Sequence, residues 1–300
     1  KYIQQTLSCL CAQSYPNIEL IVVNDGSTDH TLALAERVID DRIRIINLPN
    51  SGAAKARNIA YQHAKGEYII FFDADDYIPP EFISRQLQKL NGRNDAVVLS
   101  GWGRFYNDDP NTFKADPTPD GEMTFEDWIK LYWYKATPMT NPGRALIPAA
   151  IIEKAGGWNE SLSLNDDLEF FTRIFLNSQS IIFDQEALFY YRSGIQGLSG
   201  KTGSEAMESL YQSIYISINQ VVAQYQHDPL VLKSCANMWQ SFIYIIYPFH
   251  QQQLQLAYHE IGKLAQPDLQ FPASGYTKLL TTALGWKLAK KIKLFINKPS

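Results

Sequence analysis

The sequence is poor in cysteine and has no long apolar run. Its 300 residues include only Cys9, Cys11 and Cys235. The first two are too close for an ordinary disulfide, and no second pair completes a metal site, so we expect three small reduced side chains in the core. No apolar stretch reaches the roughly 20 residues that span a bilayer, and no signal peptide is apparent. We expect a cytoplasmic protein, with peripheral contact to the inner membrane face as an option.

The sequence also lacks a strong excess of charge. Its net charge of −4 gives no overall attraction to nucleic acid, which we therefore do not expect as a partner. Hydrophobic residues make up 45% and aromatic residues 13% of the chain, which is enough for a large core and argues against disorder. Acidic residues occur instead in short local groups, and these groups are where we look for a site.

Strand and helix patterns alternate through the first hundred residues. Short apolar runs typical of buried strands occur at 20–23, 43–46, 68–72 and 96–99. Helical patterns occur at 2–13, 31–39 and 53–64, and Pro79-Pro80 opens another. This alternation predicts an α/β fold, with a mostly parallel sheet flanked by helices. Ligands of such sheets bind outside the carboxyl ends of the strands, where Asp25 and the cluster 73–76 are expected.

The pattern changes after residue 100. Residues 107–121 are rich in Asn, Asp, Pro and Gly, which predicts a loop. Helices are predicted at 125–134, 148–155 and 166–176, and short strands at 181–183 and 188–191. From residue 204 the strand signal ends and three or four helices are expected. We place a domain boundary at residue 203, between an α/β domain (1–203) and a helical C-terminal region (204–300).

The acidic cluster predicts a cation site. Asp73, Asp75 and Asp76 place three carboxylates within four residues, and these repel one another unless a cation is present. Mg²⁺ and Mn²⁺ prefer oxygen ligands and are often held by one or two carboxylates plus substrate phosphates. A solvated turn that caps the next helix would explain the same carboxylates, so both interpretations stay open at this point.

Two other segments have the chemistry to bind a nucleotide. Asp25 can accept hydrogen bonds from a base or ribose, and Gly26 allows the backbone to turn tightly. The small-residue loop 50–52 enters a helix that bears Lys55 and Arg57, and both helix N-termini and basic side chains attract anions. A simple turn and a solvated surface helix are the structural alternatives.

Asp166 and Asp167 begin the predicted helix 166–176. Acidic residues in a first turn are favoured by the helix dipole, which alone would explain them. However, Asp167 shares a helix face with Phe171 and Ile174. A carboxylate above that apolar stripe would be partly desolvated, as a general base can be.

Taken together and in this order, these motifs resemble the family 2 glycosyltransferases of the GT-A fold, with a C-terminal helical extension here. The resemblance covers about two thirds of the chain. The motifs that carry it are 15–29, Gly52, Ala56-Arg57-Asn58, Gly66, 71–76, Gly156-Gly157-Trp158 and 166–169.

The resemblance implies a role for each matched position. Asp25 corresponds to the aspartate that binds the nucleotide base, and Arg57 to a basic residue near the base and phosphates. Asp73 and Asp75 correspond to the two aspartates of the DxD motif, near the ribose and the metal. The Glu-Asp motif becomes Asp166-Asp167. Asp166 would lie at the nucleotide sugar and Asp167 would be the catalytic base.

The implied reaction is inverting transfer of one sugar from a nucleotide-diphosphate sugar, with UDP as the expected nucleotide. The acceptor would be a hydroxyl of a glycan or lipid-linked glycan, in polysaccharide synthesis of the cell envelope. Mn²⁺ or Mg²⁺ would bind at Asp73 and Asp75. The Gln-x-x-Arg-Trp motif of processive members is absent, which favours single transfers. The family's opening strand would precede Lys1, and the loop 192–199 lies where members often have a mobile loop over the donor.

Two other functions remain as alternatives. A nucleotidyltransferase would use a related sheet and similar metal chemistry, and a non-catalytic relative would only bind sugars or membranes. The segment 276–296 mixes apolar residues with lysines. Such a basic amphipathic helix can lie on an anionic membrane or pack on the rest of the protein.

Overall fold

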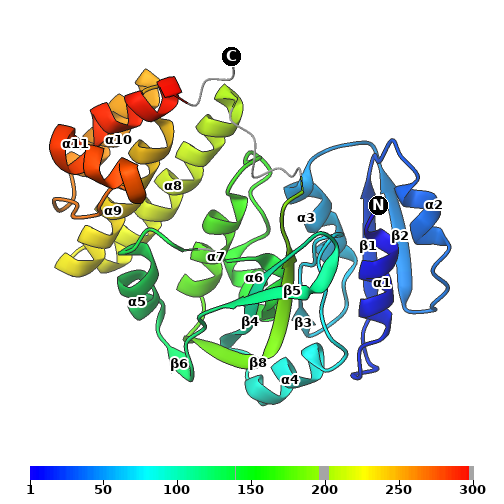
Figure 1. Ribbon diagram of the computed structural model, residues 1–300. Helices are drawn as coiled ribbons and strands as arrows, with labels where there is room; N and C mark the ends of the chain where they lie inside the picture. Colours follow the sequence, from blue (N-terminus) through cyan, green and yellow to red (C-terminus); the bar gives the residue numbers. More distant parts are fainter. Residues whose placement is uncertain (139, 196–202, 297–300) are drawn as a thin grey trace. The chain divides into compact units, whose positions relative to one another are not determined.

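The computed structural model describes residues 1–138, 140–195 and 203–296, and it divides into two compact units (Figure 1). The first unit comprises 1–125 and 139–201, and the second comprises 126–138 and 202–300. The short segment 126–138 therefore belongs with the C-terminal helices, although it interrupts the first unit in the sequence.

The first unit begins with the predicted alternation of helices and strands. Its elements are α1 (Ile3–Cys11), β1 (Leu20–Asp25), α2 (Thr31–Glu36), β2 (Ile43–Leu48) and α3 (Ala53–His63). β1 and β2 pair in parallel, from Leu20 opposite Ile43 to Asp25 opposite Leu48. Ile3 and Leu7 of α1 form a small core with Ala35 of α2. Both strands end where their loops lead toward helices, as expected for βαβ units.

A second, larger sheet has the strand order β3-β7-β4-β8-β6, with β5 paired to β4. The strands are β3 (Tyr68–Ile69), β4 (Ala96–Tyr106), β5 (Asp109–Asp116), β6 (Glu122–Met123), β7 (Ala145–Pro148) and β8 (Ser180–Arg192). Only β4 and β8 pair in parallel here, and the other pairings are antiparallel. The α/β fold with helices around a sheet is confirmed, but the pairing is mixed, and the expectation of a mostly parallel sheet was wrong.

The predicted loop 107–121 contains a strand. Asn107 and Asp108 have φ values of 56° and 59°, and β5 pairs back onto β4 immediately after them. Two consecutive residues with positive φ form the tight turn that suits a β-hairpin, and such a turn only permits antiparallel pairing. The Asn-Asp pair was the available signal, and the polar composition of the segment concealed it. The predicted strands 181–183 and 188–191 likewise form one strand, β8, with an irregularity in its pairing to β4 near Ser100.

Helices complete the first unit around this sheet. They are α4 (Phe82–Leu90), α6 (Ala149–Ala155) and α7 (Asp166–Leu176). Phe170 and Phe171 of α7 are almost fully buried, as are Val98 and Leu99 of β4. The core of this unit therefore lies around β4, between the helices that position the candidate site.

The second unit is helical. It contains α8 (Ser204–Tyr225), α9 (Pro229–Ile246), α10 (Gln251–Gly262) and α11 (Gly275–Ile296), together with the π-helical turn Ile129–Trp133 that follows α5 (Phe125–Trp128). Asn237 of α9 donates to the carbonyl of Tyr134 at 2.7 Å and fixes the segment 126–138 to the bundle. α11 is interrupted at Gly285, which has a φ of 76°. Within the described ranges, no helix combines the length and apolar character that crossing a membrane requires.

Candidate active site

Asp25 ends β1 and binds the loop that leads into α3. Its Oδ1 accepts hydrogen bonds from the backbone N–H and the hydroxyl of Ser51, at 2.7 and 2.9 Å. Its Oδ2 accepts one from the N–H of Gly52 at 2.9 Å. Gly26 turns the chain next to this loop with a φ of 69°, and a Cβ there would lie 2.5 Å from the backbone nitrogen of Asn50. Asp25 thus shapes the entrance to α3, and a nucleotide at this carboxylate would share its oxygens with the loop.

Arg57, one turn into α3, joins two of the predicted acidic segments. Its Nη2 donates to Oδ1 of Asp73 at 2.8 Å, and its Nη1 donates to Oδ2 of Asp166 at 2.9 Å. Its side chain is only 17% exposed. Burial by itself would lower the pKa of Arg57, but the surrounding aspartates outweigh this cost and hold its pKa above the ordinary value. One guanidinium therefore holds the acidic turn, residues 73–76 after β3, beside the start of α7.

The Gly-Gly-Trp motif supports this arginine. The Trp158 ring lies under the Arg57 guanidinium at 4.4 Å and stacks on Phe170 of α7 at 4.0 Å. Asn58 holds the Trp158 backbone by donating to its carbonyl at 2.9 Å and accepting from its N–H at 2.7 Å. A Cβ on Gly157 would lie 2.5 Å from the Asn58 amide oxygen, so only glycine allows this approach. The motifs Arg57-Asn58 and Gly156-Gly157-Trp158 form one structural assembly, in which Trp158 is buried.

Two of the three carboxylates in the acidic turn 73–76, those of Asp75 and Asp76, have different surroundings. Asp76 is 1% exposed, and its Oδ1 accepts a hydrogen bond from the Arg192 N–H at 2.9 Å. Burial, followed by the charges of its two acidic neighbours, raises the pKa of Asp76 well above the ordinary value. Asp75 is half-buried, and neither of its carboxylate oxygens accepts a hydrogen bond from the described residues. Burial and the charge of Asp73 raise the pKa of the Asp75 carboxyl.

Arg192, at the end of β8, is a residue of this site that the sequence interpretation assigned only to a loop. Its side chain is fully buried, and its Nε donates to the Asp75 carbonyl at 2.6 Å. It also donates to Gln5 of α1 at 2.6 Å and pairs with Asp108 at 2.7 Å. No local pattern marks Arg192, because its hydrogen-bond partners come from three separate segments. The remainder of the predicted mobile loop, from residue 196, lies outside the described residues.

Asp167 has the desolvated environment that the helical pattern predicted. Its Oδ1 is buried without a hydrogen-bond partner in the described structure. Burial and then the charge of Asp166 raise the pKa of Asp167 well above the ordinary value, and the nearby Arg57 charge opposes this. Burial also raises the pKa of the Asp166 carboxyl, although the positive charge of Arg57 partly offsets this effect. A carboxylate that is short of hydrogen bonds and raised in pKa has the properties of a proton acceptor.

The donor set at the acidic turn fits a small divalent cation that completes its coordination with substrate oxygens. Asp75 offers an unbonded carboxylate, and Asp73 keeps Oδ2 free of the Arg57 contact. A complete protein cage is not formed, since the described ranges hold no group of three or more acidic, His or Cys ligands. Mg²⁺ and Mn²⁺ are commonly bound by one or two carboxylates together with phosphates, which this pair allows.

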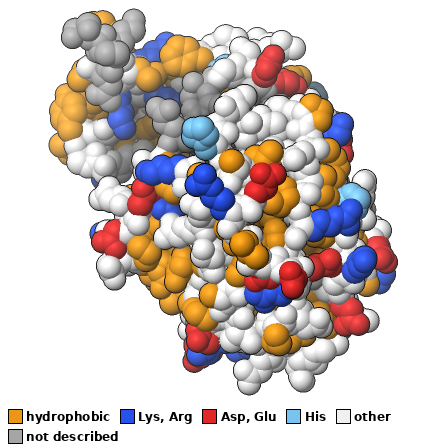
Figure 2. Space-filling view, turned by 90° about the vertical axis from the view of Figure 1, so that its right-hand side faces the viewer, with side chains coloured by type: hydrophobic (Ala, Val, Ile, Leu, Met, Phe, Trp, Pro, Cys, Tyr) orange, Lys and Arg blue, Asp and Glu red, His pale blue; other side chains and the backbone are white. Residues whose placement is uncertain are grey.

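The predicted site residues fall into two groups. Asp73, Asp166 and Arg57 form a direct network, and Asp167 and Asp75 are close enough to it for their pKa values to respond. The Asp25 carboxylate bonds only to the loop 50–52 among the described residues. The two groups are linked through α3, whose N-terminal loop contacts Asp25 and whose Arg57 contacts Asp73. On the face shown in Figure 2, acidic and basic side chains are interspersed.

This fold is that of the GT-A glycosyltransferases. The structure resembles residues 1–349 of TarS from S. aureus in complex with UDP-GlcNAc, with a TM-score of 0.70 and 19% sequence identity over all of this chain and 89% of that chain. It also resembles the mannosyltransferase PcManGT from Pyrobaculum calidifontis in complex with GDP-Man and Mn²⁺, with a TM-score of 0.55 and 18% identity over 99% of this chain and 77% of that one.

The chain belongs to glycosyl transferase family 2, whose family model matches residues 1–156, just over half of the chain. It is 25% identical over 248 residues to EpsH of Bacillus subtilis, a protein named as a glycosyltransferase, covering 76% of this chain and 69% of EpsH. It is 40% identical over 118 residues to an uncharacterized glycosyltransferase of Haemophilus influenzae, covering 38% of this chain and 46% of that protein. The match to GlyG of Streptococcus pneumoniae is 27% over 205 residues and covers 64% of this chain and 66% of GlyG.

Proposed function

We propose that this family 2 glycosyltransferase moves one sugar, with inversion, from a UDP-sugar to a hydroxyl of a glycan or lipid-linked glycan. The observation that carries the proposal is the Arg57 bridge, because it brings the acidic turn and the start of α7 to one place. A donor diphosphate at the turn would then lie near the carboxylate proposed as the base. The bound UDP-GlcNAc of TarS makes a UDP-sugar the first donor to test.

Asp167 is the proposed base. Its buried carboxylate would accept the proton of the acceptor hydroxyl while that oxygen attacks the anomeric carbon. The bond from the anomeric carbon to the diphosphate oxygen breaks on the opposite face, so the configuration inverts. The nucleoside diphosphate leaves with the bonding electron pair. Asp166 would keep Arg57 in place and line the sugar side of the site.

Asp73 and Asp75 would hold Mn²⁺ or Mg²⁺ through carboxylate oxygens. A cation bound there supplies positive charge that stabilises the departing diphosphate. Asp75 is the stronger candidate ligand, because its carboxylate has no hydrogen-bond donor among the described residues and lies beside the negative Asp73. Asp73 is already bonded to Arg57 through Oδ1, so it would contribute its second oxygen.

Asp25 and the loop 50–52 would bind the nucleoside. The Asp25 carboxylate and the backbone of this loop lie together at the end of β1, ahead of the helix that bears Arg57. A base or ribose that hydrogen-bonds to Asp25 would enter this loop, and its phosphates would extend toward Arg57 and the acidic turn.

The direct test is incubation with a panel of UDP- and GDP-sugars and Mn²⁺, with mass spectrometry of the products. Release of a nucleoside diphosphate from one donor, with loss of turnover in Asp167→Asn, is expected. Asp41→Asn is the matched control, because Asp41 is exposed and makes no contact with the site. Turnover in Asp167→Asn equal to that of the control would contradict the proposed base, and pyrophosphate release from an NTP would indicate a nucleotidyltransferase.

The α11 helix is the proposed contact with an anionic membrane on its cytoplasmic face, where a lipid-linked acceptor would be found. Leu279 is 70% and Phe295 is 78% exposed, and no acidic residue follows Asp268 in the sequence. Some of its lysines have internal partners. Lys290 donates to the carbonyls of Tyr244 and Ile245, and Lys287 lies over aromatic rings. Lys278 and Lys293 are exposed and have no such partner among the residues that the structure describes, so they are available to anionic head groups.

Co-sedimentation with vesicles tests this contact. We expect binding to phosphatidylglycerol vesicles but not to phosphatidylcholine vesicles, and a marked decrease in the double variant Lys278→Glu, Lys293→Glu. The double variant Lys89→Glu, Lys154→Glu is the control, because it makes the same charge change at two exposed positions of the first unit. Equal binding of the Lys278→Glu, Lys293→Glu variant and the control to anionic vesicles would contradict the proposed membrane contact through α11.

A further inference from the structure

The backbone of the acidic turn is held by side chains from two other elements of the first unit. The hydroxyl of Thr6, in α1, donates to the carbonyls of Ala74 and Asp76, both at 3.0 Å. The Nε of Arg192, at the end of β8, donates to the carbonyl of Asp75 at 2.6 Å. Three successive carbonyl groups of the turn are therefore each bonded to a side chain from α1 or β8.

These bonds set the direction of the Asp75 side chain. A peptide unit is planar, so the two soft dihedrals of a residue decide how its two flanking peptide planes are turned. The carbonyl bonded to Thr6 belongs to the plane before Asp75, and the carbonyl bonded to Arg192 belongs to the plane after it. With both planes held, the φ and ψ of Asp75 are set, and the direction of its Cα–Cβ bond is set with them.

The carboxylates of Asp75 and Asp76 consequently have different roles. Asp76 turns its carboxylate to β8, where Oδ1 accepts a hydrogen bond from the Arg192 N–H at 2.9 Å. The Asp75 carboxylate accepts no hydrogen bond from the described residues, although its own carbonyl is bonded. Asp75 is thus held through its backbone, and its carboxylate stays available to a ligand.

Both anchoring side chains are themselves held in place. Thr6 is almost fully buried, as is the side chain of Arg192. The Arg192 guanidinium also donates to Asp108 and Gln5, at 2.7 and 2.6 Å. Its centre lies 4.1 Å from the centroid of the Tyr2 ring. Hydrogen bonds at such buried positions are stronger than in water, so the turn is attached to firm points.

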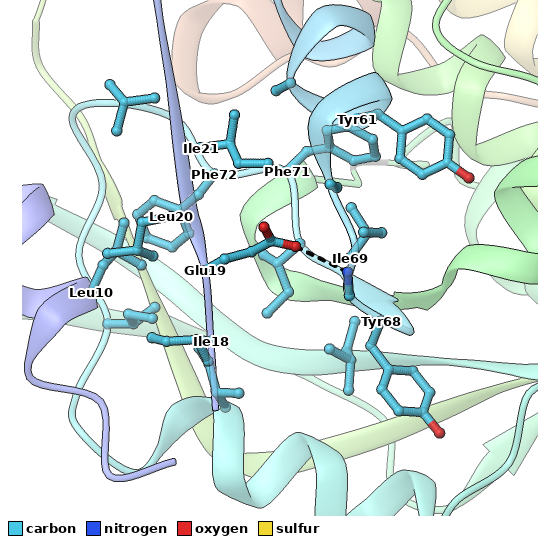
Figure 3. Close-up of a pocket in the computed structure, with 18 of the residues that line it drawn as sticks. Leu10, Ile18, Glu19, Leu20, Ile21, Tyr61, Tyr68, Ile69, Phe71 and Phe72 are labelled. Atoms are coloured by element: carbon cyan, nitrogen blue, oxygen red, sulfur yellow. Dashed lines mark hydrogen bonds between the residues drawn. The ribbon is translucent and has the colours of Figure 1, made fainter. Parts of the chain in front are cut away.

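The chain that leads into the turn is held by aromatic contacts. Phe71 and Phe72 extend to opposite sides of the segment 68–72, with Phe71 on the side of Tyr61 (Figure 3). The ring centroids of Phe71 and Tyr61 are 6.4 Å apart, and those of Phe72 and Phe189 in β8 are 5.7 Å apart. The turn is therefore tied to β8 at its start as well as through its carbonyl groups.

We propose that Thr6 and Arg192 are positioning residues for the divalent cation that the transferase would bind with its donor. They hold the Asp75 carboxylate in one direction, so less conformational entropy is lost when the ion binds. Small divalent ions such as Mg²⁺ demand close to ideal geometry, which makes a pre-set ligand direction valuable. This role rests on the proposed function, in which Asp75 is a ligand of the cation.

The variant Thr6→Val tests this role, with Thr6→Ser as the conservative variant. Valine keeps the shape of threonine but removes the hydroxyl, whereas serine keeps the hydroxyl. Calorimetric titration of UDP at a series of Mn²⁺ concentrations gives the Mn²⁺ concentration at which UDP binding is half-maximal. We expect this concentration to rise at least about fivefold in Thr6→Val, as for the loss of one buried hydrogen bond, and to stay near the wild-type value in Thr6→Ser.

Thr281→Val is the matched control, because the Thr281 hydroxyl also donates to a carbonyl, at 2.8 Å, but in the second unit. Saturating Mn²⁺ should restore the UDP affinity of Thr6→Val. A purely structural role for Thr6 would lower the free energy of unfolding and leave the Mn²⁺ requirement as in the control. That result would overturn the proposal.

Arg192→Lys is the second variant. Lysine keeps the charge but cannot reproduce the planar set of three bonds, so we expect the Mn²⁺ requirement to rise at least about tenfold. If this variant does not fold, the comparison of Thr6→Val with Thr6→Ser decides the question alone.

The same titrations separate this proposal from the proposed function. Mn²⁺-dependent UDP binding that is equal in the wild type and Thr6→Val would overturn the positioning role and leave the transferase proposal intact. UDP binding by the wild type that does not respond to Mn²⁺ would contradict the metal site itself, and the positioning role with it. Neither readout depends on sugar transfer or on the identity of the sugar.

Discussion

Arg57 and Asp166 form an ion pair in which Nη1 lies 2.9 Å from Oδ2, and this contact joins α3 to the first turn of α7. The other terminal nitrogen of Arg57 bonds to Asp73 at 2.8 Å, and the face of the guanidinium lies on Trp158. A planar group with several donors can make these three contacts at once, whereas an ammonium group cannot. This one side chain therefore connects the acidic turn directly to the start of α7, next to Asp167.

We predict that Arg57→Met destabilises the protein by about 1–3 kcal/mol, because it leaves the partly buried carboxylates of Asp73 and Asp166, which are 34% and 16% exposed, without their partner. Arg57→Lys should keep more stability but lose donor turnover by about 10–100-fold, since it cannot form both bonds. Denaturant unfolding and steady-state turnover measure the two effects. Arg37→Met is the control, because Arg37 is exposed and has no partner in the described structure. Equal free energies of unfolding for Arg57→Met and Arg37→Met would show that the ion pairs of Arg57 do not stabilise the fold.

Asp167→Asn is predicted to separate activity from stability. Transfer should fall by at least about 10²-fold with loss of the base, while the thermal midpoint at neutral pH should stay the same or rise. The reason is that the buried carboxylate has a raised pKa, so holding it ionised at neutral pH costs folding free energy. Differential scanning fluorimetry at pH 7 measures the midpoint. A clear decrease relative to Asp41→Asn would show that Asp167 has a structural role instead.

The pH dependence of the folding stability follows from the same raised pKa of Asp167. Above the ordinary aspartate pKa of about 3.9 and up to its raised value, the folded protein holds a proton on Asp167 that the unfolded chain has lost. The stability that protonated Asp167 contributes at low pH is therefore lost as the pH rises through the pKa of Asp167 in the folded protein. The Asp167→Asn variant should gain stability relative to the wild type as pH increases through this window.

Transferase activity should rise with pH over the range in which the contribution of Asp167 to folding stability falls. The base form of Asp167 is lost as pH falls through its raised pKa, so kcat/KM should fall at a higher pH than an ordinary aspartate would give. Unfolding curves and initial rates from pH 4 to 8 measure both trends, and a stability difference that is independent of pH would contradict the assignment.

Asp75→Asn should abolish the metal dependence of donor binding. In the wild type, EDTA is expected to weaken UDP-sugar binding by at least about tenfold, because the Asp73 and Asp75 carboxylates would hold a cation whose charge offsets that of the diphosphate. In Asp75→Asn, binding should already be weak and insensitive to EDTA, whereas Asp41→Asn should behave as the wild type. Titration calorimetry with and without Mn²⁺ distinguishes these cases, and a full Mn²⁺ response in Asp75→Asn would remove Asp75 from the metal site.

Gly157→Ala should weaken the hydrogen bonds that position Trp158 against the Arg57 guanidinium. Its Cβ would lie 2.5 Å from the Asn58 amide oxygen, so the two Asn58 bonds to the Trp158 backbone could not both form. We expect a loss of about 1–3 kcal/mol, typical of a buried hydrogen-bonded group left without its partner. Gly262→Ala is the matched control, because a Cβ there meets nothing within 4 Å. Unfolding curves for the two variants that coincide would contradict this account of the motif.

The sequence by itself determined the elements with strong local patterns. The helices around α1, α3 and α7 and the parallel pair β1 and β2 follow from apolar periodicity and turn residues, which are local properties. The ordered motifs also placed the chain in its family. The desolvation of Asp167 could be expected because its helix face is defined by residues three and four positions apart.

Tertiary structure decided the remaining features. The mixed pairing of the larger sheet depends on which strands meet, and the hairpin strand β5 has a composition typical of loops. The Arg57 bridge joins three distant segments, and the buried Arg192 bonds to residues from three segments distant from its own. Such contacts are long-range, so no pattern within one segment encodes them.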